Sequence, residues 1–376
     1  KEILPLSSIT FLLCLTSFVA FCVGTLIFYS GKSKRGFASL VEGNSIILYV
    51  GKSWFVTISL LTLLFSLILL FYFKKLGGFP MLVDDVDKAR NSMGGWFQFV
   101  SMLVKPVLVV SYSLLFMKKI VRTNAKKIHY LLLVSTLLMA SVLLLLTGSR
   151  GHLLFIVLVA YLMRCIYSGA NYRGLAIAGL IGFTVISAFR YLRQYLMFGD
   201  AYVESISQSW MFGEHFLFLY SGYVTLTMNY SILEKLVQTF VYGDHAYQYG
   251  YNTFLPLIAP LVPGKQETLG DFQNRVWDTG FDYNLTSTFL GIPLADFGPV
   301  GCVAICFLFG IMVSLAQRFM FRYKTAAFVF IYAQLVSFII FSFYSFPFTG
   351  LHSYVYPVVS SVIFGLAFKM FRRTTA

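Results

Sequence analysis

The sequence predicts an all-α polytopic membrane protein, with about 9–11 transmembrane helices and one long outer (periplasmic) loop that contains short amphipathic helices. Three observations predict this class. The chain of 376 residues is 58% hydrophobic and only 12% charged, whereas soluble domains average about 25% charged residues. Apolar runs of about 20 residues, long enough to cross a hydrocarbon core about 30 Å thick, recur along the chain. These runs are continuous rather than alternating, which is typical of membrane helices.

The apolar runs fall in two blocks on either side of a polar interval. The first block predicts spans over residues 3–29, 54–73, 97–117, 128–146, 153–167 and 175–189, and the second predicts spans over residues 300–321, 326–343 and 355–370. We therefore expect three parts. N-terminal transmembrane helices occupy residues 1–189, a long extracytoplasmic loop with the candidate active site occupies 190–298, and C-terminal transmembrane helices occupy 299–376.

Basic residues in the short loops assign the sides of the membrane. The loops near residues 32–52, 118–127, 164–173 and 318–324 and the C-terminus are strongly basic, which favours the cytoplasm. One parity satisfies all of them and puts the polar interval on the outer face of a bacterial cytoplasmic membrane. It also puts the first residue outside, so we expect a further span before it. The formal charge of +14 then reflects topology and anionic membrane lipid rather than a nucleic-acid partner.

Four arginines on the outer side are candidates for binding a diphosphate. Arg150 lies between two apolar helices in a glycine-flanked turn, Arg190 and Arg193 lie three residues apart at the end of a span, and Arg275 stands in a polar run. The planar guanidinium group fits phosphate oxygens in pairs and is always charged. The alternatives are contacts with lipid headgroups and, for Arg275, an ion pair with a near neighbour.

Attack by a hydroxyl group would also need a base, and the same interval supplies the candidates. These are His215, Glu214, Asp271, Asp282 and His245. His215 has the most suitable unperturbed pKa, near about 6.5, although a histidine in such an apolar segment can be purely structural. Residues 210–228, which include Glu214 and His215, predict an amphipathic helix at the interface or half of a re-entrant pair. We find no nucleotide-binding, dinucleotide-binding or zinc motif, so we expect no cofactor and no metal.

Aromatic residues make up 18% of the chain, and tyrosines crowd the polar interval. Tyr220 and Tyr249 are among them. A tyrosine ring offers a flat apolar surface and a hydroxyl to a sugar. Amphipathic rings also suit a membrane interface, which would explain the tyrosines without any sugar.

Short motifs add a family resemblance. They are TGSRG at residues 147–151, YGYNTF at 249–254, DYNLTST at 282–288 and LADFGPVG at 294–301, the last leading into a span. With the hydropathy profile, these motifs make the chain resemble the Wzy-type oligosaccharide repeat-unit polymerases, which build O-antigen and capsule.

The resemblance implies a reaction and its partners. A growing glycan on undecaprenyl diphosphate would be the donor, and a newly flipped lipid-linked repeat unit would be the acceptor. The four arginines would hold diphosphates, Asn284 and the two tyrosines would contact glycan, and a chain-length regulator and a flippase are candidate partners. An O-antigen ligase is the nearest alternative, and a lipid-linked oligosaccharide flippase or other transporter is the alternative from a different class.

Overall fold

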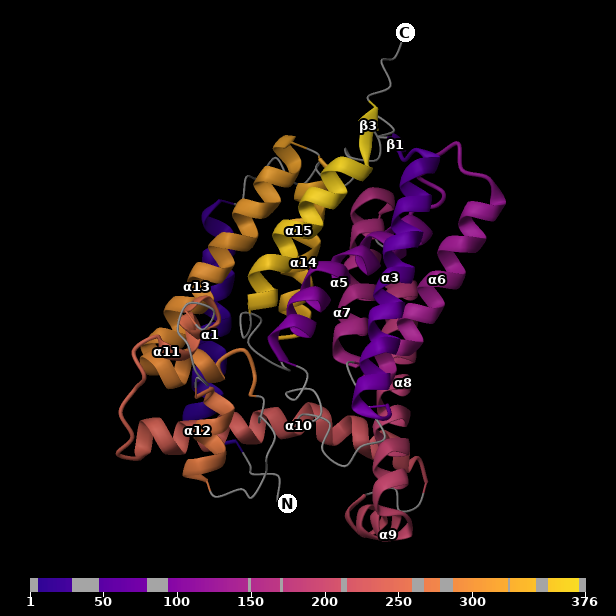
Figure 1. The fold of residues 1–376 in the computed structure, drawn as a ribbon. Coiled ribbons are helices and arrows are strands. Elements are labelled where there is room, and N and C mark those ends of the chain that lie inside the picture. The colour runs from indigo at the N-terminus through magenta and orange to yellow at the C-terminus, as the bar shows by residue number, and fades with distance from the viewer. Residues whose placement is uncertain are drawn as a thin grey trace.

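The computed structural model is built almost entirely of helices that pack into an elongated bundle (Figure 1). It describes residues 6–28, 47–79, 94–147, 150–169, 172–210, 215–258, 267–277, 287–323, 325–342 and 351–371. Every span predicted from the apolar runs coincides with a helix. These helices are α1 (Ser8–Ile27), α3 (Lys52–Leu76), α5 (Gly94–Phe116), α6 (Lys127–Leu146), α7 (Arg150–Ser168), α8 (Tyr172–Phe198), α13 (Gly291–Tyr323), α14 (Ala326–Ile340) and α15 (Leu351–Ala367).

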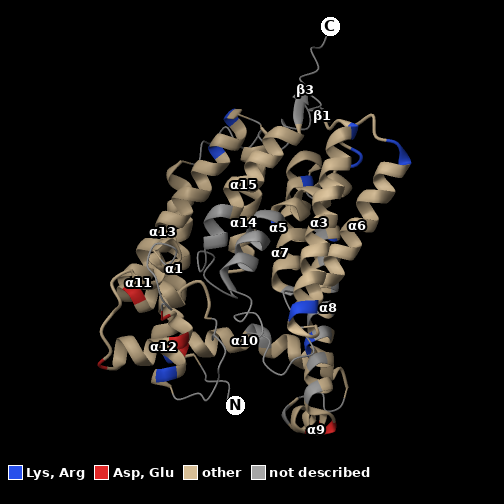
Figure 2. Ribbon diagram, in the orientation of Figure 1, with Lys and Arg blue, Asp and Glu red and all other residues tan. Residues whose placement is uncertain are grey.

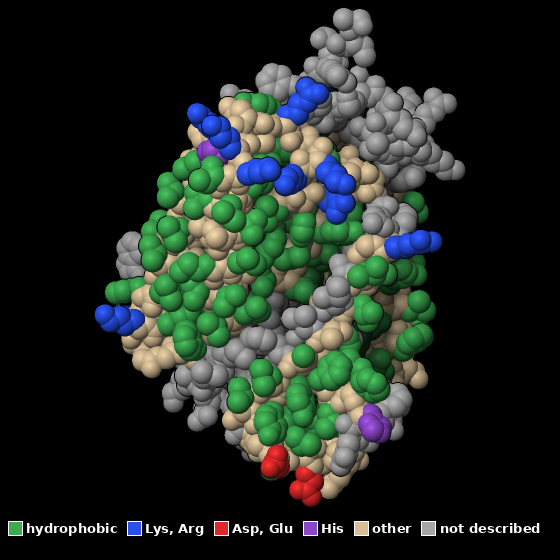
Figure 3. Space-filling view, turned by 90° about the vertical axis from the view of Figure 1, so that its right-hand side faces the viewer, with side chains coloured by type: hydrophobic (Ala, Val, Ile, Leu, Met, Phe, Trp, Pro, Cys, Tyr) green, Lys and Arg blue, Asp and Glu red, His purple; other side chains and the backbone are tan. Residues whose placement is uncertain are grey.

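Five of the described helices are long and apolar enough to cross a membrane, namely α1, α3, α6, α7 and α13. Helix α14 and parts of α5 and α15 are apolar but shorter. Figure 3 shows one face of the molecule, on which many apolar side chains lie in the middle, most basic side chains lie toward one end and the acidic side chains lie at the other. The predicted class, an all-α polytopic membrane protein, is confirmed.

The interior is divided into two hydrophobic cores. The first core joins α3, α5, α6, α7 and α15 around side chains such as Phe65, Leu108 and Leu133. The second core joins α1, α10, α12 and α13 and includes Leu236 and Cys302. Helix α14 contributes to both, so it connects the two halves of the bundle.

Helices α1 and α13 cross at two glycines. A Cβ atom on Gly24 would clash with the backbone carbonyl oxygen of Phe307, and a Cβ atom on Gly310 would clash with that of Phe21. Small residues let membrane helices approach until their backbones touch, which replaces the hydrophobic driving force that lipid does not provide. The crossing therefore fixes α1 against the helix that begins at the polar interval.

The polar interval is mostly helical and lies at one end of the bundle (Figure 1). It contains α9 (Asp200–Ser209), α10 (Leu217–Val237), a π-helical turn η3 (Gln238–Tyr242), α11 (Tyr251–Ile258) and α12 (Leu269–Val276). Helix α10 lies across the bundle rather than along it. Helix α8 does not stop where the apolar run stops but continues to Phe198, so Arg190 and Arg193 belong to a helix.

A small sheet, which the sequence did not lead us to expect, closes the opposite end. Strand β1 (Ile47–Tyr49) pairs in parallel with β2 (Val121–Arg122) and antiparallel with β3 (Lys369–Phe371). Residues 46–50 form an Ile-Ile-Leu-Tyr-Val run, whose β-branched and aromatic composition favours a strand. Basic side chains gather at this end of the bundle (Figure 2).

Candidate active site

The predicted arginines fall into two places. Arg190 is half-buried on α8, and Arg193 lies one turn further along the same helix, but the side chain of Arg193 is outside the described residues. Arg150 is the first residue of α7, and its side chain is also outside them. Arg275 lies on α12. Figure 1 shows α8 at one end of α10 and α12 near the other, so the structure does not bring Arg190 and Arg275 together.

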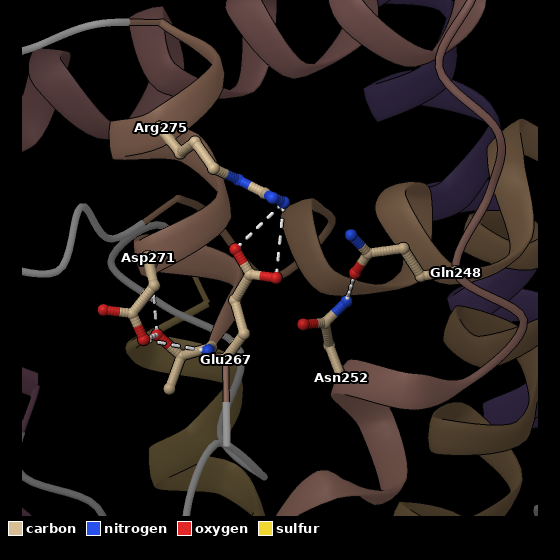
Figure 4. Close-up of polar contacts among 6 residues, drawn as sticks. Gln248, Asn252, Glu267, Asp271 and Arg275 are labelled. Carbon is tan, nitrogen blue, oxygen red and sulfur yellow. Dashed lines mark hydrogen bonds and ion pairs between the residues drawn. The ribbon is translucent and has the colours of Figure 1, made fainter. Parts of the chain in front are cut away.

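Arg275 makes an ion pair with a near neighbour, as one of the two alternatives expected. Its Nη2 atom lies 3.0 Å from Oε1 and 3.3 Å from Oε2 of Glu267 (Figure 4). The guanidinium group also lies over the Phe272 ring, 5.8 Å from its centroid. The two charged side chains are 66% and 46% exposed, and such exposed pairs contribute only about 0–1 kcal/mol. An anionic ligand could therefore displace Glu267 at little cost.

Asp271, a candidate base, holds the start of α12. Its Oδ2 accepts hydrogen bonds from the backbone N–H and the hydroxyl of Thr268, at 2.9 and 2.8 Å, and the Thr268 hydroxyl accepts from the Asp271 N–H at 3.2 Å. This reciprocal arrangement is a capping box. It gives Asp271 a structural role, while its role as a base stays a prediction.

His215 and Tyr220 come together at the end of α10 that lies beside α8. His215 is exposed in the turn before α10, and its backbone carbonyl accepts a hydrogen bond from the Trp210 indole at 3.1 Å. The Trp210 ring packs edge-on against Tyr220, with centroids 5.5 Å apart. Helix α10 begins at Leu217, after His215, so the predicted amphipathic helix begins later than expected. Glu214, Asp282 and Asn284 lie outside the described residues.

The crossing of α8 and α10 brings Arg190 to the same end of α10. A Cβ atom on Gly222 would clash with the Ser187 hydroxyl and lie 2.6 Å from the Phe183 ring, so any larger residue would force these side chains to move. We call this region, with Ser187, Arg190, His215, Tyr220 and Gly222, the α8–α10 corner.

At the other end of α10, two motif segments far apart in the sequence form one unit. The N–H of Gln248 donates to the carbonyl of Ala295, and the N–H of Tyr249 to the carbonyl of Asp296, both at 2.9 Å. Gly298 has a φ of +70° and breaks α13 just before Pro299, and the Tyr247 ring lies where its Cβ would be. We call this unit, residues 247–254 with 294–298, the α11–α13 junction.

Asp296 holds the junction together, although the sequence analysis did not single it out. Its side chain is 0% exposed. Oδ1 accepts from the N–H and the side-chain amide of Asn252, at 3.1 and 2.8 Å, and Oδ2 accepts from the N–H and hydroxyl of Thr253, at 2.6 and 2.7 Å. Asn252 also donates to the side chain of Gln248 (Figure 4). A carboxylate at a helix N-terminus satisfies N–H groups that the helix leaves unpaired.

The junction places Tyr249 on the surface in an uncommon backbone conformation. Tyr249 has a φ of +48°, a left-handed conformation that costs an L-residue roughly 1–2 kcal/mol. Its side chain is nevertheless 84% exposed, so the packing of this ring contributes little to offset that cost. Gly250 follows with a φ of +89°, and its Cβ would lie 3.0 Å from the Phe297 ring.

A second buried carboxylate, Glu234, lies near the same end of α10 and accepts hydrogen bonds from the start of α1. Its Oε2 accepts from the N–H and hydroxyl of Ser7, at 2.9 and 3.0 Å, and from the hydroxyl of Thr10 at 2.6 Å. Burial acts to raise the pKa of Glu234, but the hydrogen bonds from Thr10, Ser7 and Gln238 outweigh it and leave the pKa below its ordinary value. Sequence spacing gives no signal for this contact, because the partners are more than 220 residues apart.

The two ends of α10 thus hold different groups. The α8–α10 corner has Arg190, His215 and Tyr220, whereas the junction has Tyr249 and Asp296, with Arg275 nearby on α12. A series of aromatic rings connects the junction to Arg275. The ring centroids of Tyr247 and Phe240 are 6.1 Å apart, those of Phe240 and Phe272 are 5.5 Å apart, and Arg275 lies over the Phe272 ring. Within the described ranges, no group of three or more His, Cys, Asp or Glu side chains could hold a metal ion.

Comparison with known proteins identifies the family. No curated protein and no solved structure matches the chain. A family model described as "Putative O-antigen polymerase" matches residues 2–344, which include the spans of both blocks up to α14 and the whole polar interval. The match agrees with the resemblance drawn from the short motifs, and the chain belongs to the O-antigen polymerase family.

Proposed function

We propose that the protein polymerises oligosaccharide repeat units carried on undecaprenyl diphosphate, at the outer face of the bacterial cytoplasmic membrane, into O-antigen or capsular polysaccharide. The observation that carries this proposal is the family match over residues 2–344. The arrangement of the molecule agrees with it, because the polar helices gather at the end opposite the basic loops, and basic loops favour the cytoplasm.

The reaction is a glycosyl transfer between two lipid-linked substrates. A hydroxyl of the acceptor repeat unit attacks the anomeric carbon of the growing donor glycan. A new C–O bond replaces the bond to undecaprenyl diphosphate, which leaves as an anion, and the hydroxyl proton passes to a base. Fixed cationic groups at the leaving diphosphate stabilise the charge that develops in the transition state.

Two separated arginine places suit two diphosphates. Donor and acceptor each have one, so a polymerase must hold two anionic groups at once. In our proposal Arg190 and Arg193, with Arg150, hold one diphosphate at the α8–α10 corner, and Arg275 holds the other after leaving Glu267. Because α10 runs from the corner toward α12, the glycan of the acceptor would extend along this helix until its hydroxyl reaches the anomeric carbon bonded to the donor's diphosphate.

The base must lie close to the acceptor hydroxyl, because it takes the proton of that group. His215 is our first candidate, because it is exposed at the α8–α10 corner and because imidazole is a common general base in enzymes. Asp271 is engaged in the capping box of α12, and Glu214 and Asp282 remain candidates of the same interval. Substitution of each by alanine, with polymer yield as the readout, would identify the residue.

Deletion of the gene in its bacterium tests the proposed function. Loss of a polymerase leaves single repeat units on the lipid carrier, which a glycan gel and mass spectrometry of extracted lipid would reveal. Polymer that accumulates on the carrier would instead identify a ligase and contradict the proposal. Re-expression of the full chain should restore the ladder of polymer lengths.

A further inference from the structure

The α11–α13 junction carries an exposed aromatic ring, that of Tyr249. Tyr249 is 84% exposed with a φ of +48°, and its own N–H is bonded to the carbonyl of Asp296 at 2.9 Å. The Asp296 carboxylate binds the two residues at the start of α11, through four hydrogen bonds of 2.6–3.1 Å. One buried residue therefore fixes the chain on both sides of the Tyr249–Gly250 turn, so the Cα–Cβ bond of Tyr249 has a defined direction.

The residues that precede this ring favour an aqueous or interfacial setting over hydrocarbon. The preceding residues Asp244, His245 and Ala246 are all exposed, and an exposed aspartate is not tolerated in the hydrocarbon region of a bilayer. An exposed tyrosine ring in an aqueous or interfacial setting is suited to a partner with both apolar and hydroxyl surfaces.

The position of Arg275 indicates which partner this is. Tyr247 belongs to the junction, and the stacked rings of Tyr247, Phe240 and Phe272 lead from it to the guanidinium group of Arg275. In a lipid-linked glycan the first sugar is bonded directly to the diphosphate. A diphosphate at Arg275 would therefore bring sugar rings to the neighbouring surface, where Tyr249 is exposed.

We infer that Tyr249 is a platform on which a sugar ring of the lipid-linked glycan stacks, and that Asp296 is the positioning residue that aims it. This inference rests on the proposed function. It assigns to the junction the glycan of the substrate whose diphosphate lies at Arg275, and it gives the strained Tyr249 backbone a purpose that packing does not supply.

The test measures glycan binding by the full chain in lipid nanodiscs. The probe is the single repeat-unit oligosaccharide released from its lipid carrier by mild acid, followed by saturation-transfer NMR. Tyr249→Asn keeps a residue that tolerates the left-handed conformation but removes the ring, and we expect it to weaken binding about three- to tenfold. Tyr249→Phe keeps the ring and should bind within about twofold of the wild type.

Tyr242→Asn is the matched control, because Tyr242 is a 60% exposed tyrosine in the η3 turn of the same interval. We expect its binding to be unchanged. Wild-type affinity for Tyr249→Asn would overturn the inference. So would normal binding combined with loss of Tyr249→Asn protein from the membrane, since that outcome identifies an interface anchor.

A double-mutant cycle tests the role of Asp296. Asp296→Asn puts an amide N–H₂ group in place of a carboxylate oxygen that accepts two hydrogen bonds, and we expect it to weaken oligosaccharide binding about as much as Tyr249→Asn does. Added to Tyr249→Asn, it should cause no further loss, because both changes act through one ring. An equal loss in both backgrounds would contradict the positioning role. Single repeat units in the deletion strain would leave the proposed function standing even if this inference fails.

Discussion

The two ends of α10 are built on different principles. At the α8–α10 corner, helices meet through a glycine, through the hydroxyl groups of Tyr202 and Ser221 at 2.9 Å, and through the rings around Trp210. At the other end, Glu234 and Asp296 are 2% and 0% exposed, and each accepts several hydrogen bonds from a helix N-terminus. No other acidic side chain in the described ranges is buried to this degree.

The difference teaches which end sets the geometry. A buried carboxylate with all its donors in place allows one arrangement, because any shift leaves charged and polar groups unpaired. Contacts between rings and small residues tolerate small sliding movements. We therefore regard the junction as the fixed reference of the site and the corner as the end that can adjust to its substrate.

Removal of a positive charge from the α8–α10 corner is the strongest test of its role in catalysis. Arg190→Ala should lower polymer formation by about 10²–10³-fold while the protein remains in the membrane, because one stabilising group at the leaving diphosphate is lost. Arg190→Lys should fail as well, since lysine lacks the planar fork. A glycan gel with an immunoblot for the protein measures both.

Arg318→Ala is the control for this prediction, because Arg318 is an exposed arginine near the end of α13 at the basic end of the bundle. It should give polymer of normal length. A normal ladder from Arg190→Ala would remove the corner from the catalytic site.

Removal of the carboxylate from the junction should have the largest effect on stability. Asp296→Ala leaves buried donors of Asn252 and Thr253 without acceptors, and we expect a loss of about 3 kcal/mol in the free energy of unfolding. Thermal unfolding in detergent measures it. Thr268→Ala, which removes the cap of the more exposed helix α12, should cost only about 1 kcal/mol. Equal losses in the two variants would show that the junction is no more rigid than an ordinary helix end.

The packing of the corner can be broken without touching a charge. Gly222→Leu forces a side chain into the space of Ser187 and Phe183, and overpacking of this kind costs about 1–3 kcal/mol. If the corner adjusts as we expect, the variant should remain folded and show reduced polymer yield. Gly222→Ala should lie between this variant and the wild type, and a fully active Gly222→Leu would argue against close contact between α8 and α10.

We expect the smallest effect from Glu234, whose protonation makes the stability of the folded protein depend on pH. The pKa of Glu234 is lower in the folded protein than its ordinary value, so the folded state binds fewer protons than the unfolded state near that pKa. The stability from Glu234 is therefore present above pH of about 4.5 and is lost as the pH falls below it. Thermal unfolding at pH 7 and pH 4 should show the loss in the wild type and a weaker dependence in Glu234→Gln.

The spans could be predicted from the sequence because length and apolar character alone specify a membrane helix. Arg190 and Arg193 were expected three residues apart at the end of a span, and the helix that carries them continues past the apolar run to Phe198. The three-stranded sheet was missed because each strand is only two or three residues long, too short for alternation to show.

The site was predicted only in part, for a physical reason. Arg275 was expected either to pair with a near neighbour or to bind phosphate, and the structure identifies Glu267, eight residues away, as the partner. Asp296 and Glu234 depend on partners 43–44 and 224–227 residues away, and no local pattern encodes such contacts. The one signal for Asp296 was its place in the LADFGPVG motif, next to a glycine and a proline that break the helix.

The sheet at the basic end has a consequence for the order of assembly. Strand β1 is its central strand, yet β3 follows α15 and is synthesised after every helix described here. While the ribosome feeds the chain into the bilayer, β1 can pair with β2 as soon as α5 is inserted, but one of its edges stays open until α15 is in place. When β3 pairs with that edge, it joins the last helical segment to the first.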